Sequence, residues 1–110
     1  MYVWPVELRR HHRVPFTEPV VFTRKGGEKR VTGQSHDISL GGMFIETQAP
    51  EAFGTEVVVH VHVAGEPSAF ALPAIVRWTE AGGMGVQFQL LGARETHAIT
   101  ELIAEHADNE

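Results

Sequence analysis

Residues 55–64 read Thr-Glu-Val-Val-Val-His-Val-His-Val-Ala, and this stretch decides the fold. Valine fills every second position, at Val57, Val59, Val61 and Val63. The positions between them hold another valine and two histidines, Val58, His60 and His62. Because successive side chains of a strand point to opposite faces, the stretch predicts a strand with one buried apolar face and one partly exposed face.

Five other stretches have the composition of strands and are separated by turn signals. They are residues 19–24, 29–36, 43–47, 69–78 and 85–90. Gly26-Gly27 lies between the first two and predicts a hairpin, because glycine readily adopts the backbone angles of tight turns. Pro73 has no N–H to donate to a neighbouring strand. It therefore predicts that residues 69–78 form an edge strand or contain a bulge.

After Gly92 the apolar residues follow the three- and four-residue intervals of an amphipathic helix, predicted over residues 94–106. Six short strands, frequent glycine turns and one helix predict an all-β fold with a C-terminal helix, namely a six-stranded antiparallel β-barrel. The helix is expected to cover one mouth or one edge of the barrel. We predict a flexible N-terminal arm over residues 1–13, the barrel over 14–91, and the helix and tail over 92–110.

Composition limits the setting of the protein. A chain of 110 residues with 43% hydrophobic and 21% charged residues is typical of one ordinary globular domain. No apolar stretch approaches the roughly 18 residues of a membrane span, and the N-terminus does not resemble a signal peptide. Cysteine is absent, which excludes disulfides and thiolate metal sites. These features predict a cytoplasmic protein that does not insert into membranes.

The net charge of −5 is unevenly distributed. Residues 7–30 hold seven of the nine Lys and Arg residues and only three acidic residues, so this segment is near +4 and the rest of the chain is near −9. Such a division predicts a local anion site on an acidic body, and it argues against a long nucleic-acid track. Four of these cations flank Gly26-Gly27 and are alternatively the solvated rim of a hairpin, namely Arg24, Lys25, Lys29 and Arg30.

A first cluster with binding chemistry is Leu8-Arg9-Arg10-His11-His12-Arg13. Its outer arginines, Arg9 and Arg13, have RxxxR spacing, and an extended arm would place both on one side. The arginine fork donates two parallel hydrogen bonds to a phosphate or to the O6/N7 edge of guanine, and its plane stacks on a base. The cluster therefore favours an anionic ligand with purine bases.

A second cluster is Asp37-Ile38-Ser39-Leu40-Gly41-Gly42. Asp37 can accept hydrogen bonds from the N1–H and N2–H of guanine, and Ser39, two residues on, lies on the same strand face. Gly41 and Gly42 are expected to adopt positive φ and to bring backbone amides close to a ligand. Alternatively, a β-turn uses Asp, Ser and Gly for its own capping.

The two clusters together resemble the signature of the PilZ family. Val76-Arg77-Trp78, followed by Gly83-Met84-Gly85-Val86-Gln87-Phe88, resembles the last hairpin of that family. The resemblance implies a split-barrel type of six-stranded barrel that binds cyclic di-GMP on its outer surface while the arm folds over the ligand.

The resemblance also implies roles for individual residues. Arg9 and Arg13 would be the main guanine and phosphate contacts, with Arg10 assisting. Asp37, Ser39, Gly41 and Gly42 would form the other half of the site. Trp78 resembles an aromatic residue near the ligand in some members, and it is alternatively a buried core residue. Leu8 offers no charge to a second nucleotide, which favours one ligand per chain.

Catalytic and metal sites are not predicted. The histidines occur without HxxxH or HExxH spacing, and His60 and His62 are expected to be partly exposed strand residues. A triad of His36, Asp37 and Ser39 is disfavoured, because neighbouring strand residues point to opposite faces. We therefore predict that the protein is not an enzyme and needs no cofactor other than its ligand, cyclic di-GMP.

The predicted function is that of a cyclic di-GMP receptor. Ligation would change its conformation and its binding to an unidentified protein effector, and so regulate motility, surface polysaccharide or related behaviour. An alternative is a PilZ-like interaction module that binds no nucleotide and acts in pilus or motility assemblies. A small nucleic-acid-binding barrel is disfavoured, because the acidic body shows no row of surface aromatics, so DNA and RNA are not expected partners.

Overall fold

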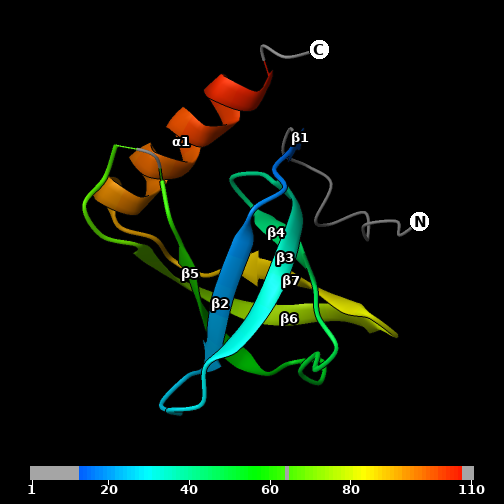
Figure 1. The fold of residues 1–110 in the computed structure, drawn as a ribbon. Helices are drawn as coiled ribbons and strands as arrows, with labels where there is room; N and C mark the ends of the chain where they lie inside the picture. Colours follow the sequence, from blue (N-terminus) through cyan, green and yellow to red (C-terminus); the bar gives the residue numbers. More distant parts are fainter. Residues whose placement is uncertain (1–12, 64, 108–110) are drawn as a thin grey trace.

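The computed structural model describes residues 13–63 and 65–107, which form seven strands and one helix (Figure 1). The strands are β1 (Val14–Pro15), β2 (Pro19–Arg24), β3 (Val31–Ile38), β4 (Gly42–Glu46), β5 (Glu56–Val61), β6 (Phe70–Glu80) and β7 (Gly83–Phe88). The helix is α1 (Ala93–Ala107). All strand pairs are antiparallel.

The sheet closes into the predicted six-stranded barrel. Its hydrogen-bonded order is β3-β2-β5-β6-β7-β4, and the pairing of β3 with β4 completes the ring. β1 is an extra strand that the sequence analysis did not predict. It pairs Val14 with Ile38 and Pro15 with Asp37, so it extends the edge of β3 beyond the end of β2.

Ser35 holds the link between β1 and β2. The side chain is fully buried, and its hydroxyl lies 2.7 Å from the Phe16 carbonyl oxygen and 2.8 Å from that of Glu18. The same hydroxyl accepts a hydrogen bond from the Glu18 amide at 2.9 Å. A buried hydroxyl is tolerated only when it is paired in this way. The link therefore anchors the end of β1 to β3.

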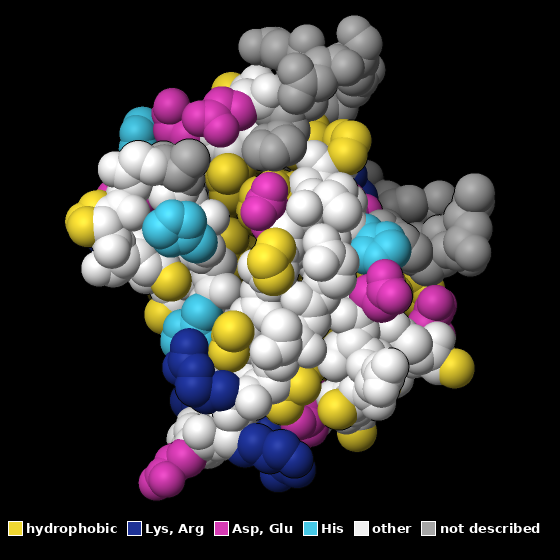
Figure 2. Space-filling model, viewed as in Figure 1, with side chains coloured by type: hydrophobic (Ala, Val, Ile, Leu, Met, Phe, Trp, Pro, Cys, Tyr) yellow, Lys and Arg dark blue, Asp and Glu magenta, His cyan; other side chains and the backbone are white. Residues whose placement is uncertain are grey.

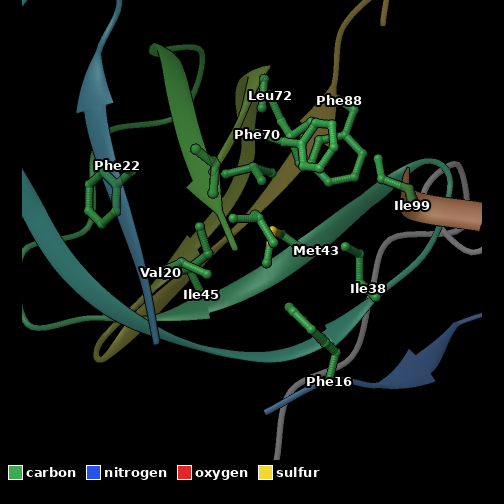
Figure 3. Packing of buried hydrophobic residues seen from close by; sticks show 14 of the residues in the cluster. Phe16, Val20, Phe22, Ile38, Met43, Ile45, Phe70, Leu72, Phe88 and Ile99 are labelled. Carbon is green, nitrogen blue, oxygen red and sulfur yellow. The ribbon is translucent and has the colours of Figure 1, made fainter. Parts of the chain in front are cut away.

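The alternation is confirmed from Val57 to Val63, although β5 itself ends at Val61 and is shorter than predicted. Val57, Val59, Val61 and Val63 are buried, whereas Val58 and His60 are half-buried and His62 is exposed. The buried valines join one core with side chains from the other strands and from α1 (Figure 3). Ile38, Met43 and Ile99 enter this cluster from β3, β4 and α1 respectively. The predicted C-terminal helix is likewise confirmed, with Ala98, Ile99 and Leu102 buried against the barrel.

Two strands, β3 and β6, contain bulges. β6 lies between β5 and β7, so the edge-strand alternative is wrong, whereas the predicted bulge is present but lies between Val76 and Trp78 and not at Pro73. Pro73 is tolerated because β7 ends at Phe88. The Pro73 carbonyl accepts the Gln89 amide at 2.8 Å, at a point beyond the ladder where no N–H is required.

The hairpin between β2 and β3 is wider than predicted. The Gly27 amide donates to the Arg24 carbonyl at 2.8 Å, and β3 begins only at Val31, two residues later than expected. All side chains from residue 24 to residue 30 are exposed. Figure 2 shows Lys and Arg side chains gathered over this hairpin at the lower end of the molecule. These cations form the solvated rim of a hairpin, which was the alternative considered for them.

Candidate ligand-binding site

Arg13 joins the two sequence clusters at the end of β3. Its guanidinium donates to both carboxylate oxygens of Asp37, from Nε to Oδ2 at 3.3 Å and from Nη2 to Oδ1 at 3.3 Å. Nη1 donates to the Ser39 hydroxyl at 3.1 Å. The Arg13 and Asp37 side chains are 13% and 15% exposed, so the ion pair is largely withdrawn from water but keeps an accessible edge. Three predicted site residues therefore form one connected group.

The Asp37 carboxylate is also fixed from the side of β4. Its Oδ1 accepts the Phe44 amide at 3.2 Å. The register of β3 against β4 shifts between Ser35 and Asp37, which leaves His36 as the extra residue of a bulge. In such a bulge two neighbouring side chains can lie on the same side of the sheet. The bulge thus turns both His36 and Asp37 outward, while Ser35 and Ile38 remain buried.

This bulge makes the alternation argument against a His36, Asp37 and Ser39 triad wrong, because His36 and Asp37 share a face. The contacts nevertheless do not form a triad. Asp37 and Ser39 are bound to Arg13, and His36 Nε2 lies 2.6 Å from Glu46 Oε1. The acidic partner of His36 is therefore Glu46 and not Asp37.

Ser39 organises the turn that follows β3. The side chain is fully buried, and its hydroxyl accepts the amides of Gly41 at 3.0 Å and Gly42 at 3.3 Å. The Ser39 amide donates to the Gly42 carbonyl at 2.9 Å and closes the turn. The expectation that the two glycine amides face a ligand is wrong, because both point at Ser39.

The predicted positive φ angles at Gly41 and Gly42 are also wrong. Among the described residues, positive φ occurs at Gly26, Gly54, Gly65 and Gly82. Gly42 is required for a steric reason instead, because the Val86 carbonyl oxygen occupies the space that a Cβ would need. The absence of a side chain allows β4 to approach β7 at the start of their ladder.

An aromatic row continues the site across the outer surface of the barrel, so the expectation that the barrel carries no such row is wrong. Phe44 on β4 and Trp78 on β6 both pair with Gly85, the residue between them on β7. Their ring centroids are 5.4 Å apart, and the His36 ring meets the Phe44 ring edge-on at 5.6 Å. Trp78 is half-buried and lies outside the core cluster, so it is not the buried core tryptophan considered as an alternative.

Glycine on β7 is what makes room for this row. A Cβ on Gly83 would overlap the Phe44 ring, and Gly85 carries no side chain between Phe44 and Trp78. Phe44 and His36 were not predicted as parts of the site. Met43, Phe44 and Ile45 form a continuous apolar run, so its pattern gives no sign that the middle residue faces outward.

Some predictions lie outside the described residues, namely Leu8, Arg9 and Arg10 with the rest of the arm before Arg13. Among residues 13–63 and 65–107, no group of three His, Asp or Glu side chains is arranged to hold a metal ion. The same part of the chain contains no helix long and apolar enough to cross a membrane.

The chain belongs to the PilZ family, because the PilZ domain matches it over residues 7–105, nearly its whole length. A search of curated proteins gave no relative with significant sequence similarity. Solved structures share the fold. The PilZ domain of CeSA from a cellulose-synthesizing bacterium has 25% identity and a TM-score of 0.71, over 86% of this chain and 96% of that one.

Two further structures are similar in fold. The PilZ domain of YcgR from Escherichia coli, solved with c-di-GMP, has 14% identity and a TM-score of 0.72, over 91% of this chain and 92% of that one. The Bacillus subtilis inhibitor of motility MotI/DgrA has 17% identity and a TM-score of 0.72, over 93% of this chain and 53% of that one. The present chain thus spans about half of MotI/DgrA.

Proposed function

We propose that this protein is a cytoplasmic receptor for cyclic di-GMP. The observation that carries the proposal is the group of Arg13, Asp37 and Ser39 beside an aromatic row on one outer face of the barrel. The group lies at the start of β1, next to the point where the segment bearing Arg9 and Arg10 enters the structure. The proposal is supported by family membership and by the c-di-GMP in the solved PilZ domain of YcgR.

Arg13 and Asp37 match the hydrogen-bond acceptors and donors of this nucleotide. Arg13 supplies donors for a phosphate or for the O6/N7 edge of guanine, and Asp37 accepts from the opposite guanine edge. The two side chains already satisfy each other, so the ligand must share or replace the bonds between them. Because each keeps an exposed edge, the ligand can share their hydrogen bonds without dismantling the turn at Ser39.

The aromatic row supplies the apolar part of the site. Trp78 is only half-buried on the outer face, and we expect its ring to stack on a guanine. Stacking of a base on an aromatic side chain is worth about 1–3 kcal/mol. Phe44 contributes by supporting Trp78 from the side of β4, because the residue is only 3% exposed.

The proposed protein acts by binding and not by catalysis, with no cofactor besides the nucleotide. Closure of the arm bearing Arg9 and Arg10 over one cyclic di-GMP would create a new surface for an unidentified protein effector. Motility is one process that such an effector could serve, as the similarity in fold to an inhibitor of motility illustrates. Neither nucleic acid nor a membrane is required as a partner.

Isothermal titration with cyclic di-GMP tests the proposal. The wild-type protein should bind one nucleotide per chain with a Kd of about 10 µM or lower. Asp37→Ala should weaken binding by at least about 30-fold, because it removes the guanine acceptor and releases Arg13. Glu51→Ala is a matched control, since it removes a carboxylate paired with an arginine at the far hairpin, and it should bind like the wild type.

A specific observation supports a second candidate, an interaction module that does not bind nucleotide. Ser39 and the two glycines build their own turn, and Asp37 is satisfied by Arg13 and Phe44 without any ligand. If the wild-type protein gives no heat with cyclic di-GMP at protein concentrations well above the expected Kd, the receptor proposal is wrong and this candidate replaces it.

A further inference from the structure

Arg77 lies on the same outer face of the barrel as the proposed site but belongs to none of its predicted contacts. It is the extra residue of the β6 bulge, since Val76 pairs with Val86 and Trp78 pairs with Gly85. Val76 is buried, whereas Arg77 is exposed and Trp78 half-exposed. The bulge therefore turns Arg77 to the outer face, next to the aromatic ring proposed to hold a base.

Gln87 holds the Arg77 guanidinium at the outer face of β7. The Arg77 Nε donates to Gln87 Oε1 at 2.9 Å. Gln87 pairs with Gly42 on its other side, so the residue that holds the guanidinium is the neighbour of the turn that Ser39 organises. Gly42 itself places no side chain between Gln87 and that turn. The distance from β4 to β6 is two strand spacings, about 10 Å.

The partners of Arg77 differ from those of the other nearby arginine. Arg13 uses its fork on a carboxylate and a hydroxyl, whereas Arg77 uses only Nε, on a neutral amide. Within the described part of the chain, no hydrogen bond or ion pair engages the two Nη groups of Arg77. Arg24 and Arg94, which are also exposed, each lie within 4 Å of a glutamate. Arg77 thus keeps a positioned pair of donors without a carboxylate.

We propose that Arg77 is a further ligand contact, which closes the site on the side of β6 opposite Arg13. Its two Nη groups would bind a pair of neighbouring acceptors on the nucleotide, either two phosphate oxygens or the O6/N7 edge of a guanine resting on Trp78. This inference rests on the proposed function. It gives the proposed site a second guanidinium on the rigid barrel, independent of the N-terminal segment.

Titration of the full chain with cyclic di-GMP tests the inference, with Arg77→Gln, Arg77→Lys and the control Arg94→Gln. Arg77→Gln should weaken binding about tenfold and leave the unfolding temperature of the free protein within about 1 °C, because the side chain is exposed. Arg94→Gln removes an exposed arginine on α1 and should bind like the wild type.

The lysine variant distinguishes the two acceptors. If Arg77 binds phosphate, Arg77→Lys should recover most of the affinity, and Arg77→Gln should bind with a weaker salt dependence than the wild type. If Arg77 binds the guanine edge, Arg77→Lys should be as weak as Arg77→Gln. Gln87→Leu should weaken binding in either case, because it releases the guanidinium.

Two results overturn the inference, and they differ in what else they affect. If the wild type binds and Arg77→Gln binds within twofold of it, Arg77 is not a contact and the proposed function still holds. If the wild type does not bind at all, the proposed function fails and the inference fails with it.

Discussion

At each end of β3 an arginine from another segment lies near a pair of glycines, but the two ends differ in how far their side chains are buried. At the β2–β3 hairpin, all side chains from residue 24 to residue 30 are exposed, and the ion pairs of Arg24 and Lys25 lie at the surface. At the other end, Arg13 is 13% exposed and bound to two side chains. The hairpin has more positive charge, but its ion pairs are exposed, whereas the ion pair of Arg13 and Asp37 is largely buried. Geometry, and not charge alone, therefore distinguishes the candidate site.

The glycines at the two ends provide the largest expected contrast. Gly42→Ala should destabilise the protein by more than about 3 kcal/mol, because the new methyl group would overlap the Val86 carbonyl and displace β4 from β7. Gly26→Ala should cost only about 1–2 kcal/mol, since Gly26 has φ of 78° but open space around it. Urea unfolding of both variants measures the difference. Equal losses would mean that the close approach at Gly42 is not the constraint.

The arginines at the two ends give the next contrast. Arg13→Ala should lower the free energy of unfolding by about 1–3 kcal/mol, because Asp37 and Ser39 lose a charged partner in a partly buried place. Arg24→Ala should change it by less than about 0.5 kcal/mol, since its ion pair with Glu51 is largely exposed. Chemical denaturation measures both values. A larger loss for Arg24→Ala would reverse the proposed difference between the two ends.

The smallest expected effect concerns pH and the charge of the hairpin. Burial, and then the positive charge of Arg30, lower the pKa of His60 from its ordinary value of 6.5. The unfolded chain therefore binds the proton at a higher pH than the folded one. The resulting loss of stability begins as the pH falls through about 6.5 and is complete below the folded pKa.

Thermal unfolding between neutral and mildly acidic pH measures this effect. The His60→Gln variant should lose less stability than the wild type on acidification. The Arg30→Gln variant should also lose less stability than the wild type, but the difference should be smaller. If neither variant changes the pH dependence, the charge of the hairpin does not act on His60.

Much of the fold could be predicted because alternation reports directly on burial. The valines of residues 55–64 indicated a strand, and the spacing of Ile99 and Leu102 indicated the helix. The bulge in β3 and the position of the bulge in β6 could not be predicted, because a single extra residue leaves the composition of a strand unchanged. Pro73 indicated a bulge in β6 as one of two alternatives but not its place. β1 was missed because it contains only two residues, and its pairing depends on the distant Asp37 and Ile38.

The candidate site was predictable by residue and less so by role. Arg13, Asp37 and Ser39 were expected to act together, and the structure connects them. The role of Gly42 was mistaken, because the atom that excludes a side chain there belongs to Val86, far along the chain. His36 and Phe44 were missed since both depend on the bulge in β3 and on the glycines of β7. Roles that depend on distant partners are not visible in a local pattern.

Nuclear magnetic resonance tests most directly which end of β3 binds the nucleotide. Addition of cyclic di-GMP to the labelled wild-type protein should shift the amide signals of Asp37, Ser39 and Phe44 and the indole signal of Trp78. Signals from residues 25–30 of the hairpin should stay in place. Shifts confined to the hairpin, or no shifts at saturating nucleotide, would contradict the account.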